Sequence, residues 1–341
     1  MEYTTGENHG KFSVFIALLG NAFVTTLKVI TATITGSTTM FAESVHSLAD
    51  TLNQSLLLIG LNRSKKPADH ARGYGYGIER FFWSLISACG ILFIGAGVTI
   101  YHSIVSLLNT GTHHKAGGML SIVILLIALI VESITLYIAV KSIQKSAQDK
   151  HKFSWAMFAE ADPITLAIVY EDGAAVLGVL VALLAQYISV LTGNHVYDAI
   201  GGILIGLILG TLAIVLIIKN YVYIIGKPLN EKVQKKIIQF LHEDACIEHV
   251  IDFKSVAVDI GKYRIYTTVE WNGTPLYEEI YDDGELKEEF EYIRDDFGEF
   301  TKLMFKTTDR IPRLIGKHID MLEKQIIEKF PEVAYLDIEI N

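Results

Sequence analysis

Ionisable side chains inside long apolar segments are the residues of this sequence that could do chemistry, because a charge buried in lipid is costly and usually reflects function or pairing. The densest group is Glu43, His46 and Asp50 in the run MFAESVHSLADTLNQ. In a helix these residues fall at i, i+3 and i+7 and share one face, which Asn53 extends. An imidazole with carboxylates suits Zn²⁺ or a similar divalent cation, whereas an all-oxygen set favours Mg²⁺ or Ca²⁺.

A second group, Glu171 and Asp172, lies in the apolar run VYEDGAAVLG. Adjacent residues point about 100° apart on a helix, so an undistorted helix cannot aim both at one ion. We expect one of them to be a metal ligand and the other an outer group or a proton carrier; a helix-end pair facing water is the alternative. Donors from two facing helices would release protons as a cation enters, which is a basis for exchanging metal for H⁺.

The remaining ionisable residues in apolar segments are Lys28, Glu132 and Asp198. We expect the Lys28 ammonium to pair with Glu43 or Glu132. Snorkelling of this side chain to a membrane interface is the alternative.

The elements that must position these residues are membrane helices. The chain has 341 residues, of which 51% are hydrophobic and only 20% charged, and such a composition is typical of a membrane protein. Crossing roughly 30 Å of hydrocarbon takes about 20 helical residues. Runs of this length lie near residues 12–35, 39–60, 81–108, 118–140, 163–190 and 199–219. The first lacks a small-residue cleavage site, so we interpret it as a retained span.

Positive charge in the short connections predicts the orientation, because cytoplasmic loops are rich in Lys and Arg. The second and fourth connections carry this charge, whereas the first, third and fifth offer little more than Lys115. The residues concerned are Arg63, Lys65, Lys66, Arg72, Arg80, Lys141, Lys145, Lys150 and Lys152. Both termini are therefore expected to be cytoplasmic, as an even number of spans requires.

After Lys227 the composition becomes that of a soluble module. A helical pattern near 229–243 precedes two alternating runs, VIDFKSVAVDI and YRIYTTVEW, and a second helical pattern near 311–329 leads into VAYLDIEI. The order predicts a small αββαβ domain with one sheet face covered. We therefore expect a transport domain over 1–227 and a cytoplasmic α+β domain over 228–341.

An acidic insertion of about 273–308 interrupts the cytoplasmic module. We expect a solvated surface segment, with a weak divalent cation site as the alternative. Cys89 and Cys246 predict neither a disulfide framework nor a thiolate metal site, and each is interpreted as a small buried hydrophobe. The net charge of -9 argues against nucleic acid binding.

The sequence resembles the cation diffusion facilitator family of divalent metal exporters. The resemblance rests on GSTTMFAESVHSLADTLNQ, PADHARGYGYGIERFFW, EDGAAVLG and YDAIGGILIG, and it is strongest to the subgroup containing zinc transporter nine. It implies an α-helical membrane protein with six transmembrane helices, followed by a ferredoxin-like cytoplasmic domain that dimerises. A bacterial inner membrane is the host membrane we expect.

The resemblance also implies the ligands of the transported metal. The family's site in the second span falls on His46 and Asp50. Its fifth-span site usually reads HxxxD, and here the aspartate is Asp172, while Ile168 occupies the histidine place. Glu171 is the natural candidate to compensate, and the sequence leaves open whether Glu171 or Asp172 is the inner ligand.

Two departures from the family pattern concern peripheral metal. In the second connection the family often reads PxDxxHPYGHG; Asp69 matches, but Arg72 and Tyr76 occupy the histidine places, which argues against a metal site there. The cytoplasmic module has few imidazoles apart from His242, His249 and His318. We expect dimerisation without a strong regulatory zinc cluster.

These observations predict a secondary transporter that exports a divalent metal, most readily Zn²⁺, in exchange for protons, as a homodimer in a lipid bilayer. The metal is cargo, and no cofactor is expected. The alternative is a membrane-bound metal sensor or scaffold whose acidic cytoplasmic domain binds a partner. No G-x-x-x-x-G-K-[ST] phosphate loop supports an ATP-driven pump, and no HExxH motif supports an intramembrane metalloenzyme.

Overall fold

The computed structural model describes residues 21–108, 119–146, 163–280 and 283–341. The chain divides into two compact units. The first unit comprises Met1–Lys65 and Glu79–Tyr221, and the second comprises Lys66–Ile78 and Val222–Asn341. The connection between the second and third helical segments thus belongs with the C-terminal residues.

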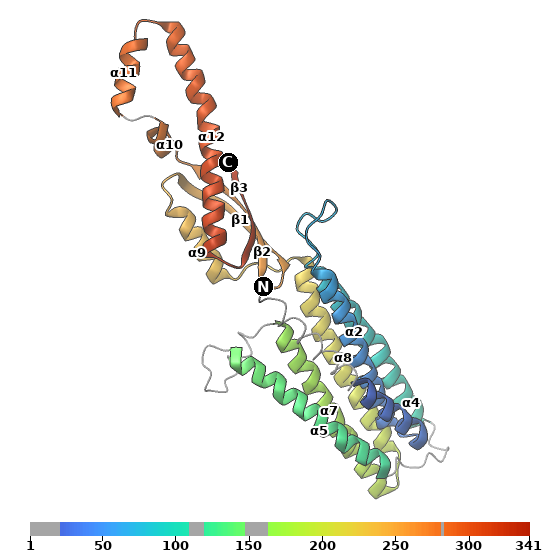
Figure 1. Ribbon diagram of the computed structural model, residues 1–341. Helices are drawn as coiled ribbons and strands as arrows, with labels where there is room; N and C mark the ends of the chain where they lie inside the picture. Colours follow the sequence, from blue (N-terminus) through green and yellow to red (C-terminus); the bar gives the residue numbers. More distant parts are fainter. Residues whose placement is uncertain (1–20, 109–118, 147–162, 281–282) are drawn as a thin grey trace, which may run out of the picture. The chain divides into compact units, whose positions relative to one another are not determined.

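Long helices that follow the apolar runs of the sequence make up the first unit (Figure 1). Residues 21–35 are helical, and Ser37 caps the next helix by accepting a hydrogen bond from the Met40 amide. A π-helical segment, η1, lies between α3 and α4, and the three form one continuous rod. The helices are α2 Thr38–Ser64, α3 Glu79–Gly90, η1 Ile91–Val98, α4 Thr99–Leu108, α5 Met119–Ser146, α7 Pro163–Thr192 and α8 Val196–Ile225.

Within the described residues, four helical segments are long and apolar enough to cross a membrane, judged from length and composition. They are Glu79–Leu108, Met119–Gln144, Ile168–Thr192 and Val196–Ile225. Helix α2 has 27 residues, but its serines, threonines, histidine and carboxylates keep it out of this group. The first apolar run begins outside the described residues. The described part of the chain is therefore a helical membrane-type protein with four strongly apolar helices.

Glycines let α8 pack tightly against its neighbours. A Cβ atom at Gly206 would lie 2.5 Å from Ile100 Cγ1 of α4. One at Gly202 would collide with the Ser103 hydroxyl of α4, and one at Gly201 with the Ala185 side chain of α7. Close approach through small residues is a common mode of helix association in membranes. The glycines of YDAIGGILIG therefore position α4, α7 and α8.

The second unit contains a three-stranded sheet with strand order β1-β2-β3. Strands β1 and β2 are antiparallel, and β2 and β3 are parallel. The elements are α9 Glu231–His242, β1 Ile247–Asp259, β2 Lys262–Trp271, α10 Gly273–Ile280, α11 Asp283–Ile293, α12 Phe297–Lys329 and β3 Val333–Ile340. Without α10 and α11, this is the helix–strand–strand–helix–strand order expected from the sequence.

Helices α9 and α12 pack against the sheet. Ile237 and Leu241 of α9 and Leu322 and Ile326 of α12 are buried in one cluster with residues of the strands, such as Ile265. At roughly 25 cal/mol per Å² of apolar surface, this burial is what stabilises the module. The first unit has its own separate core of buried apolar side chains.

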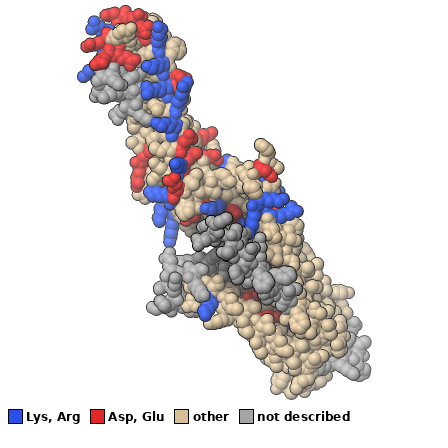
Figure 2. Space-filling model, viewed as in Figure 1, with Lys and Arg blue, Asp and Glu red and all other residues tan. Residues whose placement is uncertain are grey.

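The described part of the acidic insertion is largely helical. Its described backbone forms α10, α11 and the first part of α12, which begins at Phe297 rather than near 311. Pro312 resembles a helix start signal, but the Asp296 carboxylate caps the helix earlier by accepting hydrogen bonds from the Gly298 and Glu299 amides. Figure 2 shows Lys and Arg together with Asp and Glu on the helices of this region, whereas the helices of the first unit are mostly uncharged.

Candidate functional site

The buried pair His46 and Asp50 lies on one face of α2. The His46 Nε2 atom is 3.4 Å from Asp50 Oδ2, as their i, i+4 spacing requires. The imidazole is buried, whereas the Asp50 side chain is 25% exposed. Neither ring nitrogen of His46 has a hydrogen-bond partner among the described residues. Because buried polar atoms are rarely left unpaired, this imidazole is a candidate metal ligand.

Glu171 of α7 is directed toward α2. Its Oε2 atom accepts a hydrogen bond of 2.9 Å from Asn53 Nδ2, and the Asn53 Oδ1 atom accepts one of 2.7 Å from the Ser87 hydroxyl of α3. The Glu171 carboxylate is close enough to Asp50 to interact with it electrostatically. Asn53 and Ser87 therefore hold a second carboxylate beside the His46–Asp50 pair.

Asp172 takes a different direction. Its carboxylate accepts a hydrogen bond from Thr135 of α5, and its principal charged neighbour is Glu132, also of α5. Glu171 and Asp172 thus diverge, as expected for neighbours on a regular helix. Ile168, at the place where the family usually has histidine, is an exposed apolar side chain.

Among the described residues, no three of the four candidate ligands offer ligand atoms that all lie within 4.8 Å of one another. In the described part of the chain, three donors within 4.8 Å of one another occur only in the second unit. His46 and Asp50 are the close pair of the first unit. A metal bound by this pair would gain a third protein ligand by a change in the position of the Glu171 or Asp172 side chain.

A buried ion triad lies next to this pair. The Lys28 ammonium donates to Glu43 Oε2 at 3.0 Å, to Glu132 Oε1 at 2.8 Å and to the Ser47 hydroxyl at 2.9 Å. The side chains of Lys28 and Glu43 are fully buried, and that of Glu132 is 16% exposed. The expectation that Lys28 pairs with a carboxylate is confirmed, and it pairs with both. The triad ties residues 21–35, α2 and α5 together.

The model of the cation efflux transmembrane domain matches residues 14–225. The chain belongs to the cation efflux family, the cation diffusion facilitators. These proteins are multi-pass membrane transporters of divalent metal and not enzymes.

Individual relatives extend the similarity over nearly the whole chain. Metal tolerance protein C4 of Arabidopsis thaliana is 32% identical over 98% of this chain and 74% of its own length. The mitochondrial proton-coupled zinc antiporter SLC30A9 is 32% identical in Mus musculus and 31% in Homo sapiens, over 96% of this chain in each case. This chain spans 58% of the length of those two mammalian proteins.

Two polar motifs of this cation efflux protein have structural explanations. The first is Asp198, at the start of α8, whose carboxylate accepts from the Thr38 amide at 2.6 Å and from the Thr39 amide at 3.2 Å. The hydroxyls of Ser37 and Thr39 also donate to it. Carboxylates at a helix N-terminus satisfy its unpaired amides and its partial positive charge. Asp198 therefore anchors the start of α2, the helix that carries His46 and Asp50.

The second motif is the connection Lys66–Ile78. Asp69 accepts hydrogen bonds from the Tyr76 hydroxyl at 2.8 Å and from the Arg72 amide at 2.9 Å, and these bonds lower the pKa of its carboxyl. The Arg72 guanidinium lies over the Tyr76 ring, 4.9 Å from its centroid. Arg72 and Tyr76 thus close the loop around Asp69 by hydrogen bonds and a cation–π contact.

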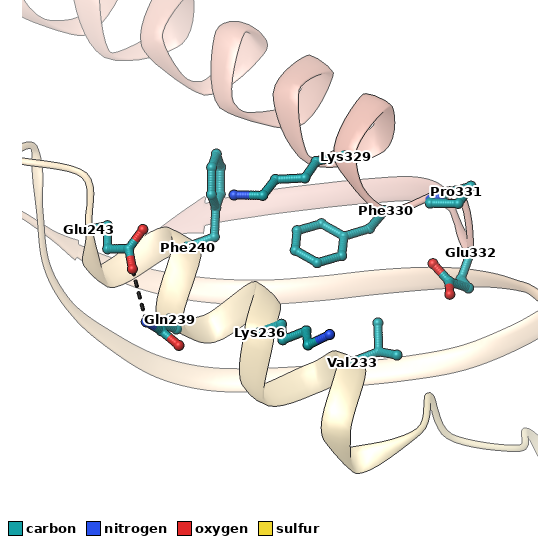
Figure 3. Close-up of a pocket in the computed structure, with 9 residues that line it drawn as sticks. All are labelled: Val233, Lys236, Gln239, Phe240, Glu243, Lys329, Phe330, Pro331 and Glu332. Carbon is teal, nitrogen blue, oxygen red and sulfur yellow. Dashed lines mark hydrogen bonds between the residues drawn. The ribbon is translucent and has the colours of Figure 1, made fainter.

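A pocket of about 440 Å³ lies between α9 and the end of α12 (Figure 3). Among its lining side chains, the Lys329 ammonium is 4.2 Å from the centroid of the Phe240 ring, and Gln239 donates a hydrogen bond to Glu243 at 2.9 Å. No set of donors converges in it, and we assign it no part in metal transport.

The sequence missed Ser87 and Thr135, which contact the site from α3 and α5. Small hydroxyl residues are common in membrane helices because they can bond their own helix backbone. Their types therefore gave no signal, and only the packing of α2, α3, α5 and α7 shows what they contact.

Proposed function

We propose that this chain exports Zn²⁺ from the cytosol in exchange for protons. The observation that carries the proposal is the His46–Asp50 pair, 3.4 Å apart on a buried helix face, with an imidazole that has no other partner among the described residues. An imidazole nitrogen and carboxylate oxygens are ligands that Zn²⁺ accepts. The mammalian relatives are by name proton-coupled zinc antiporters, which supports both the cargo and the counter-ion.

We assign His46 and Asp50 as the α2 ligands and Glu171 as the α7 ligand. Glu171 already faces α2 through Asn53, so exchanging one hydrogen bond for a metal bond would bring its carboxylate to the pair. Asp172, which faces α5, is left as the group that takes up a proton or completes the site. Metal ligands must be deprotonated to bind, so such a site holds either metal or protons.

The proposed setting is a six-span domain over 1–227 with both termini cytoplasmic, followed by a ferredoxin-like domain over 228–341 that forms a homodimer. Lys and Arg in the second and fourth connections support this orientation. A bacterial inner membrane is our proposal for the host. Light scattering of the purified full chain in detergent measures the dimer, and labelling of single cysteines placed in the connections tests the orientation.

Transport is tested by uptake into proteoliposomes with an imposed pH gradient, comparing Zn²⁺, Mn²⁺, Fe²⁺ and Co²⁺. We expect His46→Ala and Asp50→Ala to abolish gradient-driven Zn²⁺ uptake while the protein remains folded and inserted. His70→Ala and Asp295→Ala, on exposed residues, are the matched controls and should transport normally. Metal binding by the wild-type protein without any uptake would instead select the alternative, a sensor or scaffold.

A further inference from the structure

A second set of metal-binding atoms lies in the C-terminal unit. Asp244, Cys246 and His318 each offer one ligand atom, and the three atoms lie within 4.8 Å of one another. Asp244 and Cys246 belong to the turn between α9 and β1, whereas His318 lies on α12. The set therefore joins two elements that are far apart in the sequence.

The three side chains are held in place and largely shielded from solvent. Asp244 Oδ1 is 2.9 Å from His318 Nε2 and also accepts a 2.9 Å hydrogen bond from the Cys246 amide. The exposed fractions of the Asp244 and His318 side chains are 18% and 16%, and Cys246 is 7% exposed. The Trp271 ring packs edge-on against the imidazole, 5.7 Å between centroids. The donors are thus arranged before any ion arrives.

We propose that Asp244, Cys246 and His318 bind a divalent cation of the Zn²⁺ class. Thiolate, imidazole and carboxylate are the three ligand types of protein zinc, and the thiolate selects against Mg²⁺ and Ca²⁺. On binding, the Cys246 thiol loses its proton to solvent as the sulfur–metal bond forms. Three protein ligands leave a fourth position for water, which is the arrangement of an exchangeable site rather than a closed structural one.

Such a site has a mechanical consequence. A metal bound to all three residues would clamp α12 to the turn between α9 and β1. An ion that binds only the folded form raises its stability in proportion to the logarithm of its concentration. The sequence predicted that Cys246 is only a small buried hydrophobe. The structure places two further donors, Asp244 and His318, beside it.

The inference depends on the donor set of this unit and not on the transport proposal. The two proposals are separable because no sulfur belongs to the His46–Asp50 group. The competing explanation is a plain His318–Asp244 ion pair that pins α12 without metal. That explanation predicts no sulfur–metal bond.

The test titrates purified full-length protein in detergent with Co²⁺ as the spectroscopic probe. We expect a thiolate-to-Co²⁺ charge-transfer absorption that saturates and is displaced by Zn²⁺. Cys246→Ser should abolish the band. Cys89→Ser, the matched control on the other cysteine, should keep it, and so should His46→Ala and Asp50→Ala, which remove the proposed transport ligands.

Two further variants address the remaining donors and replace Cys246→Ser if that variant does not fold. His318→Gln and Asp244→Asn should each weaken Co²⁺ binding at this site by at least about 10-fold. Zn²⁺ should also slow alkylation of Cys246 in the wild-type protein and not in His318→Gln. Absence of the charge-transfer band in the wild-type protein, or its persistence in Cys246→Ser, would overturn the proposal.

Discussion

At the scale of single residues, the site depends on which way neighbouring carboxylates point. Glu171 hydrogen-bonds Asn53 of α2, and Asp172 hydrogen-bonds Thr135 of α5. Two acidic residues of adjacent number are therefore in two different environments. We propose different roles for them because their hydrogen-bond partners differ, although their chemistry is nearly the same.

The first prediction follows from this divergence. Glu171→Gln should weaken Zn²⁺ binding at the transport site by at least about 10-fold, because it removes an anionic ligand. Asp172→Asn should retain more binding but lose the dependence of uptake on the pH gradient. Isothermal titration of the purified variants and gradient-driven uptake measure the two effects. The reverse pattern would exchange the two roles.

Lys28 is the second informative residue, because its one positive charge pairs with two carboxylates, the fully buried Glu43 and the partly buried Glu132. Removing one partner of a buried ion pair leaves an uncompensated charge and costs about 3–5 kcal/mol. The triad also connects three helical segments. Its loss should therefore affect folding before it affects transport chemistry.

We predict that Lys28→Met sharply lowers the thermal stability of the protein in detergent, measured by the fraction that remains monodisperse after heating. The double variant Lys28→Met, Glu43→Gln should recover part of that stability, since it removes one of the orphaned charges. Lys235→Met, which breaks only an exposed ion pair, is the control. Full stability of Lys28→Met would show that the triad is not a structural link.

At the scale of helices, glycines decide how closely α8 approaches α4. A Cβ at Gly206 would lie 2.5 Å from the Ile100 side chain, whereas a Cβ one helical turn later, at Gly210, would lie 3.5 Å from Ala96. The first distance is a clash and the second is an ordinary contact. The two positions are otherwise similar, since both are glycines within α8.

The third prediction uses this matched pair. Gly206→Ala should destabilise the protein by about 1–3 kcal/mol through overpacking. Gly210→Ala should be neutral or stabilising by up to about 1 kcal/mol, because alanine favours helix. Thermal melts of both variants in the same detergent measure the difference. Equal melting temperatures would mean that α4 and α8 can separate without cost.

At the scale of the whole molecule, each of the two units has its own apolar core. The proposed transport ligands belong to the first unit, and the acidic insertion belongs to the second. The described part of the insertion is helical. Exposed charges act over about one Debye length, roughly 10 Å at 0.1 M salt, so its field should concentrate cations only weakly.

The fourth prediction is that the insertion is not needed for transport itself. Replacing residues 278–299 with a neutral flexible linker should leave the maximal uptake rate nearly unchanged at physiological salt. A small rise in the apparent KM is expected only at low ionic strength, where screening is weaker. If uptake stopped while membrane insertion persisted, the insertion would be a coupling or gating element.

The sequence by itself determined the features that depend on local periodicity. Apolar runs predicted the long helices to within a few residues at most ends, and alternation predicted β1, β2 and β3. The spacing of His46 and Asp50 was enough to place them together, because residues four apart on a helix are always neighbours. Helix α12 was predicted to begin near residue 311, beside Pro312, which resembles a helix start signal. It begins at Phe297 because the carboxylate of one residue, Asp296, caps it there.

Only the tertiary structure decided which distant side chains meet. Glu171 faces Asn53 across 118 positions of the chain, and Lys28 reaches Glu132 across 104. The approach of His318 to Asp244 and Cys246 likewise depends on how α12 packs against the sheet. Periodicity gives the face of a helix on which a residue lies, but not which helix covers that face. Packing between helices makes that choice, and the contacts of the α8 glycines are an example. Each such contact involves two helices, so the sequence of one segment does not reveal it.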